Sequence, residues 1–230
     1  MSLTGSVPFS EARLAFFRRT YYHLALAILA FVFLEILFIN FTPLPQLMIK
    51  MIVSTPYSWL LILGGFILAG WLARGFAAKS ESISMQYLGL GLYVLAEAII
   101  FIPILYIAAA YSSKQLIPTA GILTFCLFMA LTIVAFTTRK DFSFLRGILV
   151  MGGFVALGLI VSSVIFGFNL GMWFSGAMIL LASGAILYDT SKIIHSYPTD
   201  KHVAASLELF ASIALLFWYI LRLLMQLNRR

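Results

Sequence analysis

The sequence predicts an all-α polytopic membrane protein with seven transmembrane helices, and two observations lead to this prediction. First, the chain of 230 residues is 63% hydrophobic and only 10% charged, whereas a soluble domain is about half apolar and about a quarter charged. Second, apolar stretches of about 20 residues, the length that crosses a bilayer as a helix, recur seven times with short loops between them. No loop is long enough for a soluble domain, so residues 1–230 are expected to form a single transmembrane domain.

The first span follows a polar segment, residues 1–19, which ends in two arginines. No small-residue cleavage site follows the apolar run, which indicates a signal anchor rather than a removable signal peptide. Between the first two spans, prolines bracket the semi-apolar residues 46–55, which are expected at the membrane interface or as a helix extension. In chain order, the spans are expected at residues 20–40, 57–76, 85–111, 118–137, 146–168, 170–194 and 204–227.

Charged or polar residues mark the ends of the later spans. The second span ends at Arg74, and the fourth ends just before Arg139 and Lys140. The third contains Pro103, which frees a backbone carbonyl inside the membrane. The sixth is separated from the seventh by the polar segment SYPTDK, residues 196–201.

The basic residues orient the predicted bundle, because lysine and arginine are retained on the cytoplasmic side of a membrane. The loops on the opposite side hold Lys50 and Lys114. The last helix and tail carry Arg222, Arg229 and Arg230, and because seven spans place this tail outside the cytoplasm, these three arginines violate the rule. The net charge of +7 therefore reflects topology rather than nucleic-acid binding. With the N-terminus inside, the cytoplasmic side holds ten basic residues: Arg13, Arg18, Arg19, Arg74, Lys79, Arg139, Lys140, Arg146, Lys192 and Lys201.

Asp189 is the main candidate functional residue, since a carboxylate at membrane depth costs about 2.5–3.5 kcal/mol on insertion scales. At 100° per residue it shares a face of the sixth span with small residues, which let helices approach closely. Asp189 is therefore expected to face the bundle. The small-residue face is Gly171, Ser175, Met178, Ala182, Ala185 and Asp189, and the opposite face, expected to meet lipid, is Trp173, Leu180, Leu187 and Ile194.

Five other polar residues are candidates. Glu208 and Ser212 lie one turn apart on the seventh span, at about the depth of Asp189, and Arg74 ends the second span on the same side. The alternatives are that Arg74 snorkels to the interface and that Glu208 is a first-turn acid favoured by the helix dipole. Glu97 and Glu35 lie deep in the third and first spans; both are candidates to line a pore, or to be neutralised by burial.

Several function classes are excluded by the sequence. A retinal protein needs a lysine in its last helix, and none follows Lys201. Membrane-protease motifs are absent, and His23, His195 and His202 do not show metal-ligand spacing with cysteine or carboxylate. We expect no enzymatic activity and no cofactor, while metal binding remains open.

Three stretches together resemble the transmembrane Bax inhibitor motif family. TTRKDFSFLRG, residues 137–147, is similar to the linker between its fourth and fifth helices. ILYDTSKII, followed by a span that begins AASLELF and ends ILRLL, resembles its last two helices. GLGLYVLAEAIIFIPILYIA, residues 89–108, resembles the third span of the bacterial YccA-like branch.

The resemblance implies six helices around a central seventh. It also implies a pH-sensitive leak pathway for calcium or other cations, with regulation of cell death in eukaryotic members. The family pairs an aspartate of the sixth helix with one of the seventh, latched by an arginine of the second. Asp189 matches the first aspartate and Arg74 the arginine, while Ser212 stands in place of the second aspartate, a departure shared with YccA-like proteins. Members of this branch are associated with FtsH, a membrane-anchored protease of the bacterial inner membrane.

Three functional hypotheses follow. The protein forms a cation pathway gated near Asp189, where an ionised Asp189 beside Arg74 holds helices two and six together until acid loosens them. Alternatively, it is a non-conducting regulator that binds and restrains an FtsH-type protease. In the third hypothesis, Asp189 and Arg74 form a purely structural pair. In each, the lipid bilayer is the environment. In the first, Glu208 is a candidate to replace part of the missing aspartate's charge.

Overall fold

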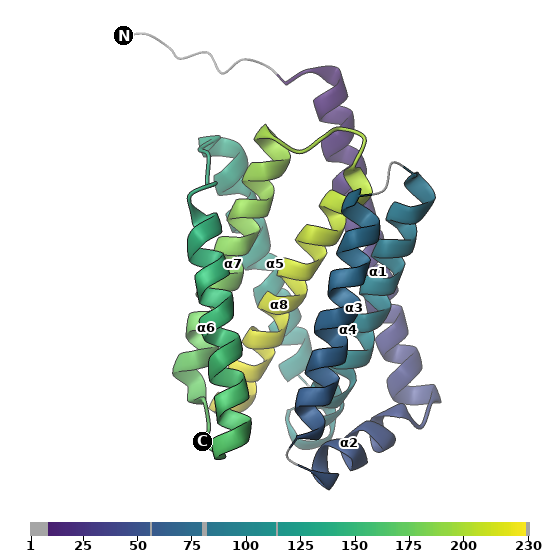
Figure 1. Ribbon diagram of the computed structural model, residues 1–230, viewed down its shortest axis with the longest axis vertical. Coiled ribbons are helices and arrows are strands. Elements are labelled where there is room, and N and C mark those ends of the chain that lie inside the picture. The colour runs from purple at the N-terminus through teal and green to yellow at the C-terminus, as the bar shows by residue number, and fades with distance from the viewer. Residues whose placement is uncertain (1–8, 56, 80–81, 114, 229–230) are drawn as a thin grey trace.

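The computed structural model describes residues 9–55, 57–79, 82–113 and 115–228 and consists, over these residues, of helices joined by short loops (Figure 1). Seven helices are long and apolar enough to cross a membrane, which confirms the predicted fold class. The helices are α1 (Glu11–Phe41), α2 (Leu44–Ser54), α3 (Ser58–Lys79), α4 (Ile83–Tyr111), α5 (Leu116–Thr138), α6 (Leu145–Phe166), α7 (Gly171–His195) and α8 (His202–Asn228).

Helix α1 begins well before the expected start at residue 20. Ser10 caps it, since its side chain accepts a hydrogen bond from the backbone N–H of Arg13, and such a cap satisfies an otherwise unpaired helix donor. The helix has 31 residues, or about 46 Å at 1.5 Å per residue, more than the roughly 30 Å of a bilayer core. Its first turns therefore extend beyond the bundle (Figure 1).

Residues 46–55 fall largely within a separate short helix, α2, which lies across the end of the bundle (Figure 1). Pro45 stands in its first turn, where proline costs no hydrogen bond because the N–H there has no helical partner. Pro43 precedes it as the N-cap residue. The interfacial alternative of the sequence analysis fits this arrangement, because α2 is too short to span a bilayer.

Helix α8 is the central helix of the bundle (Figure 1). It packs against α1, α3, α4, α5 and α7, and most of its side chains are buried along its first six turns. Helix α6 packs mainly on α7 and is the least buried of the seven spans. The central position of the last helix is as the family resemblance implied.

Close packing joins α3 to α4 at Gly89. A Cβ atom added there would lie 2.5 Å from the carbonyl oxygen of Ala73 and 2.9 Å from the backbone nitrogen of Ala77. Both alanines are almost completely buried. Small residues allow two helices to approach this closely, so Gly89 sets the distance between α3 and α4.

The predicted faces of α7 are correct for most of its length. Ser175 and Ala182 are fully buried, whereas Trp173 is 89% and Leu180 is 75% exposed. The prediction is wrong at the end of the helix, where Ile194 is buried and Leu187 is half-buried.

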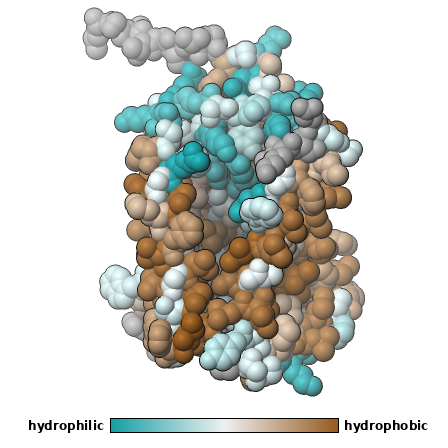
Figure 2. All heavy atoms as spheres, viewed as in Figure 1, coloured by the Kyte–Doolittle hydropathy of each residue, from teal (hydrophilic) through white to brown (hydrophobic). Residues whose placement is uncertain are grey.

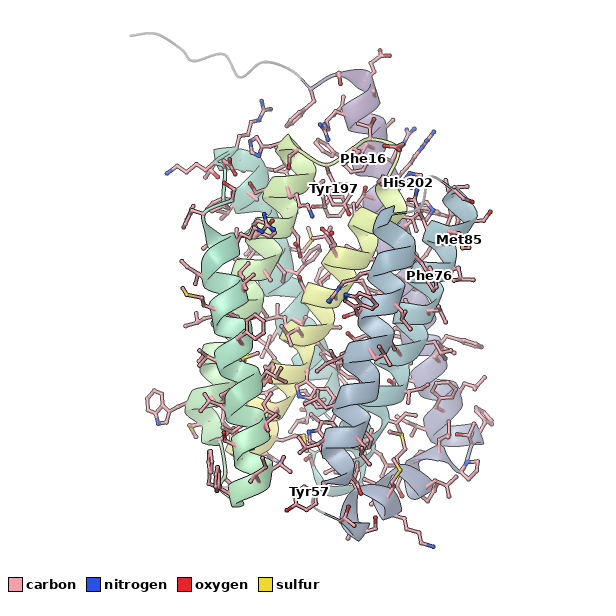
Figure 3. All side chains as sticks on the ribbon, viewed as in Figure 1. Phe16, Tyr57, Phe76, Met85, Tyr197 and His202 are labelled. Carbon is pink, nitrogen blue, oxygen red and sulfur yellow. The ribbon has the colours of Figure 1, made fainter. Side chains whose placement is uncertain are left out.

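The N-terminal part of α1 covers the end of α7. Arg13 Nη1 donates to the carbonyl oxygens of Ile193, at 3.3 Å, and Tyr197, at 2.6 Å. Phe16 stacks on Tyr197 with ring centroids 6.1 Å apart, and the two lie together at the upper end of the bundle (Figure 3). A helix end leaves carbonyls without helical partners, and Arg13 satisfies one of them. These contacts remove the end of α7 from the lipid-facing surface.

Helices α1 and α8 place their free ends at opposite ends of the bundle, as seven spans require (Figure 1). On the face shown in Figure 2, hydrophilic residues gather at the end where α1 begins, and apolar residues cover most of the rest. Residues 1–8 of the expected cytoplasmic segment, Lys114, Arg229 and Arg230 lie outside the described residues.

Candidate functional site

A cavity of about 700 Å³ lies along the central helix α8, between α3 and α4 on one side and α6 and α7 on the other. Figure 2 shows the hollow in this face, with hydrophilic side chains in its upper part between apolar surfaces. On α8 the lining runs from Glu208 to Arg222, about 21 Å at 1.5 Å per residue. The charged residues of the lining are Arg74, Glu97, Asp189, Lys192, Glu208 and Arg222.

Asp189 and Ser212 join α7 to α8 in this cavity. Ser212 Oγ donates to Asp189 Oδ2 at 2.6 Å, and both residues are 8% exposed. A carboxylate can only accept hydrogen bonds when ionised, so the serine is the donor. A hydrogen bond to an ionised acceptor is short and about twice as strong as a neutral one. The link between the two helices therefore depends on the protonation state of Asp189.

Lys192 and Glu208 form a second link between the same helices, one turn nearer the end of the bundle. Lys192 Nζ lies 2.9 Å from Glu208 Oε2 and 3.1 Å from Oε1. The two side chains are 34% and 27% exposed, so this pair lies at the mouth of the cavity. Lys192 Nζ also lies 4.8 Å from the centre of the Tyr197 ring. Burial and, after it, the Glu208 carboxylate raise the pKa of Tyr197 above its usual value, so that phenol stays neutral.

Arg74 does not form the expected ion pair with Asp189. Its Nη2 donates to Tyr93 Oη at 3.2 Å, and its guanidinium lies 5.3 Å from the centre of the Tyr93 ring. The salt bridge found near Asp189 among the described side chains joins Lys192 to Glu208 instead. The reason is proximity: α3 packs closely on α4, which carries Tyr93, while Ser212 already satisfies Asp189.

Arg74 nonetheless lines the same cavity as Asp189. Arg74 is also exposed, and whether its side chain reaches the membrane interface stays a prediction. The hypothesis of a purely structural Asp189–Arg74 pair is wrong in that form, because among the described residues Arg74 bonds Tyr93 and Asp189 accepts from Ser212.

The structure separates the two glutamates expected to line a pore. Glu97, 5% exposed, lies one turn after Tyr93 on α4 and lines the cavity with Asp189. Glu35 does not line it: this residue lies in a separate groove between α1, α4, α5 and α8. The sequence gives the depth of Glu35 along α1, but the side of the bundle that α1 covers is decided by packing.

Lys192 and Tyr93 are among the residues of the site that sequence reasoning missed. Lys192 was assigned only to membrane orientation, although it lies three residues after Asp189 and so on the same helix face. Tyr93 lies four residues before Glu97 on α4, a spacing that also places two side chains together. Helical spacing to a buried carboxylate was the available signal in both cases.

The far end of the cavity is aromatic. Trp59 and Trp218 stack there with ring centroids 6.0 Å apart, and Tyr219 and Arg222 complete this part of the lining. Of the acidic groups, Asp189 and Glu208 lie near Lys192, whereas Glu97 lies about midway along α4. Among the described residues, no group of three or more His, Cys, Asp or Glu side chains is arranged to hold a metal ion.

Comparisons with known proteins agree with the resemblance seen in the sequence. Residues 13–229 match the family described as "Inhibitor of apoptosis-promoting Bax1". Bax inhibitor 1 of Schizosaccharomyces pombe is 33% identical over 174 residues, which cover 73% of this chain and 62% of that protein. The modulator of FtsH protease YccA of Escherichia coli is 36% identical over 102 residues, 44% of this chain and 46% of its own length.

A viral relative shows the same partial likeness. The Golgi anti-apoptotic protein of vaccinia virus is 32% identical over 116 residues, covering 48% of this chain and 47% of that protein. The chain thus spans about half the length of the bacterial and viral relatives it matches, and rather more of the yeast one.

Proposed function

The chain belongs to the Bax inhibitor family, and from this premise we propose that it is a pH-sensitive leak pathway for calcium or other cations in the bacterial inner membrane, gated near Asp189. The observation that carries this proposal is the cavity along α8, with its carboxylates on three helices. The protein acts as a pathway and not as an enzyme, with its N-terminus in the cytoplasm.

The chemistry of the cavity suits a cation that passes through without being held. Calcium binds carboxylate, carbonyl and hydroxyl oxygens, and Glu208, Asp189, Ser212 and Glu97 supply such oxygens along the cavity. Conduction requires binding that is favourable enough to enter and weak enough to leave. Carboxylates spread over three helices meet this requirement better than a closed cluster of ligands.

The gate is the contact between α7 and α8. While Asp189 is ionised, it accepts a charge-assisted hydrogen bond from Ser212 and keeps the two helices together. Protonation removes the charge and weakens this bond, so acid loosens the helices and increases flux. Arg74 faces the same cavity from α3 and favours the ionised state by its positive charge, without forming the direct latch expected from the family.

The test is cation flux into liposomes that contain only this protein, measured across pH. Wild-type flux should rise as pH falls. Asp189→Asn should leave flux high and insensitive to pH, since asparagine is neutral at every pH. The matched control is Asp200→Asn, which neutralises an exposed loop carboxylate and should behave as wild type. Wild-type flux equal to that of empty liposomes at every pH would refute the pathway.

A second candidate function is regulation of an FtsH-type membrane protease, and it is favoured by the likeness to a protein named as a modulator of FtsH protease. In this alternative the protein conducts nothing, and its buried charges hold helices together. It predicts that a membrane substrate of the protease is degraded more slowly when this protein is present, equally with Asp189 or Asn at that position. Slower degradation together with absent flux would select this function over the first.

A further inference from the structure

A second cavity, of about 490 Å³, lies on another side of the central helix. Its rims are α1 and α5, and its floor is formed by α8 and α4. The rim residues Val32, Ile36 and Phe125 are 47%, 53% and 63% exposed, so the cavity opens toward the bilayer as a groove. Along α1 the lining runs from Tyr21 to Asn40, about 28 Å at 1.5 Å per residue.

Glu35 is the one carboxylate among the residues that line this groove. The residue is 5% exposed, and neither carboxyl oxygen has a hydrogen-bond partner within the part of the chain that the structure describes. Two other polar side chains of the lining are satisfied by their own helices, since Thr124 donates to the Ala120 carbonyl and Asn40 to the Ile36 carbonyl. A buried carboxyl group without a partner is costly. A ligand that donates hydrogen bonds would relieve this cost.

We propose that the groove binds a single-chain amphiphile with an amine head group, whose ammonium pairs with Glu35 and whose alkyl chain lies along α1. The head lies near the membrane surface because Glu35 is six residues before the end of α1 at Phe41, about 9 Å along the axis. The rest of the groove extends from there into the apolar interior of the bundle. An amphiphile that enters from the bilayer thus meets an acidic group at its head and apolar side chains along its chain.

The size of the groove favours this occupant over larger ones. The volume of about 490 Å³ falls in the range of small-molecule pockets, whereas a helix of about 10 Å diameter and the same length would need on the order of 2,000 Å³. A phospholipid carries two chains, and its phosphate would bring a negative charge beside Glu35. A single alkyl chain fits the volume of the groove, and a cationic head group is attracted to Glu35.

The test compares dodecylamine with dodecanol, which share a chain and differ in the head. Binding is measured on the full chain in phosphatidylcholine nanodiscs, with empty nanodiscs subtracted. Dodecylamine should bind about tenfold tighter than dodecanol, and Glu35→Gln should remove this preference, because only the carboxylate forms a charged pair. Glu11→Gln is the matched control, as it neutralises an exposed carboxylate of the same helix, and it should keep the preference.

The position of the chain is tested by filling the groove. Gly121 lines it, and a Cβ atom added there meets nothing within 4 Å, so Gly121→Leu should fold and weaken binding of both compounds. Gly153→Leu, at an equally open position of α6, should bind as wild type. Three results would overturn the proposal. They are equal affinity for the two compounds, an amine preference that survives Glu35→Gln, and loss of amine binding when phosphatidylethanolamine is added.

Discussion

Asp189 lies near two side chains of opposite charge, Lys192 and Glu208. Lys192 is three residues away on α7, and Glu208 lies one turn from Ser212 on α8. The pair Lys192–Glu208 is closed in the structure, so each residue cancels much of the field of the other at Asp189. Any effect of the Glu208 carboxylate on Asp189, as the sequence hypothesis expects, is therefore opposed by the charge of Lys192.

Removing Lys192 and removing Glu208 should shift the pH of half-maximal flux in opposite directions. Glu208→Gln leaves the Lys192 charge uncancelled, which favours ionised Asp189, so half-maximal flux should require a lower pH. Lys192→Gln leaves the Glu208 charge and should move half-maximal flux to a higher pH. Each shift should be about half a pH unit, because the pair is partly exposed and screened. The measurement is the liposome flux assay over a pH series.

The double variant is the control for this experiment, since removing both charges should restore a midpoint near that of the wild type. Shifts of the same sign in the two single variants would mean that the pair acts by holding α7 to α8 rather than through its charges.

At the scale of elements, the position of Arg74 depends on the packing of α3 against α4. Arg74 donates to Tyr93 of α4, and Glu97 lies one turn further along the same helix. A separation of the two helices would thus displace one charged wall of the cavity.

Gly89→Leu should force this separation, because a Cβ atom there would lie 2.5 Å from the Ala73 carbonyl oxygen. Overpacking of this kind typically costs about 1–3 kcal/mol, so the variant should unfold at a lower temperature in detergent. Its flux should also change, since Arg74 and Tyr93 move with their helices. The measurements are a thermal unfolding curve and the flux assay.

Gly91→Leu is the matched control, two residues along the same helix, where an added Cβ atom meets nothing within 4 Å. It should unfold at the wild-type temperature. If both variants unfolded alike, the cause would be the loss of glycine itself rather than the contact between α3 and α4.

For the whole molecule, the membrane orientation remains a prediction. Seven spans put the two chain ends on opposite sides, and hydrophilic residues gather at the end where α1 begins (Figure 2). The bias of basic residues places that end in the cytoplasm. The arginines Arg222, Arg229 and Arg230 oppose this bias at the other end.

Reporter fusions at both ends of the chain test this orientation directly. A reporter that is active only in the cytoplasm should give signal at the N-terminus and none after Leu227, and a periplasmic reporter should give the reverse. The physical reason is that lysine and arginine are retained in the cytoplasm, and the expected cytoplasmic side holds ten basic residues against five on the other. Cytoplasmic signal at both ends would mean that α8 re-enters the membrane rather than crossing it.

The sequence by itself determined the seven spans, because apolar length is set by the bilayer and is a local property of the chain. It also determined that Asp189 faces the bundle, since helical periodicity places it on the small-residue face of α7. The family followed from motifs such as ILYDTSKII.

Only the tertiary structure decided which residues meet. Depth along a helix gave Glu97 and Glu35 alike as candidates to line a pore, but packing put Glu97 in the cavity of Asp189 and Glu35 in a separate groove. Packing also brought Arg74 within hydrogen-bonding distance of Tyr93, and Asp189 within that distance of Ser212. The physical reason is that periodicity fixes the direction of a side chain relative to its own helix, whereas its partner depends on the rotation and neighbours of that helix in the bundle.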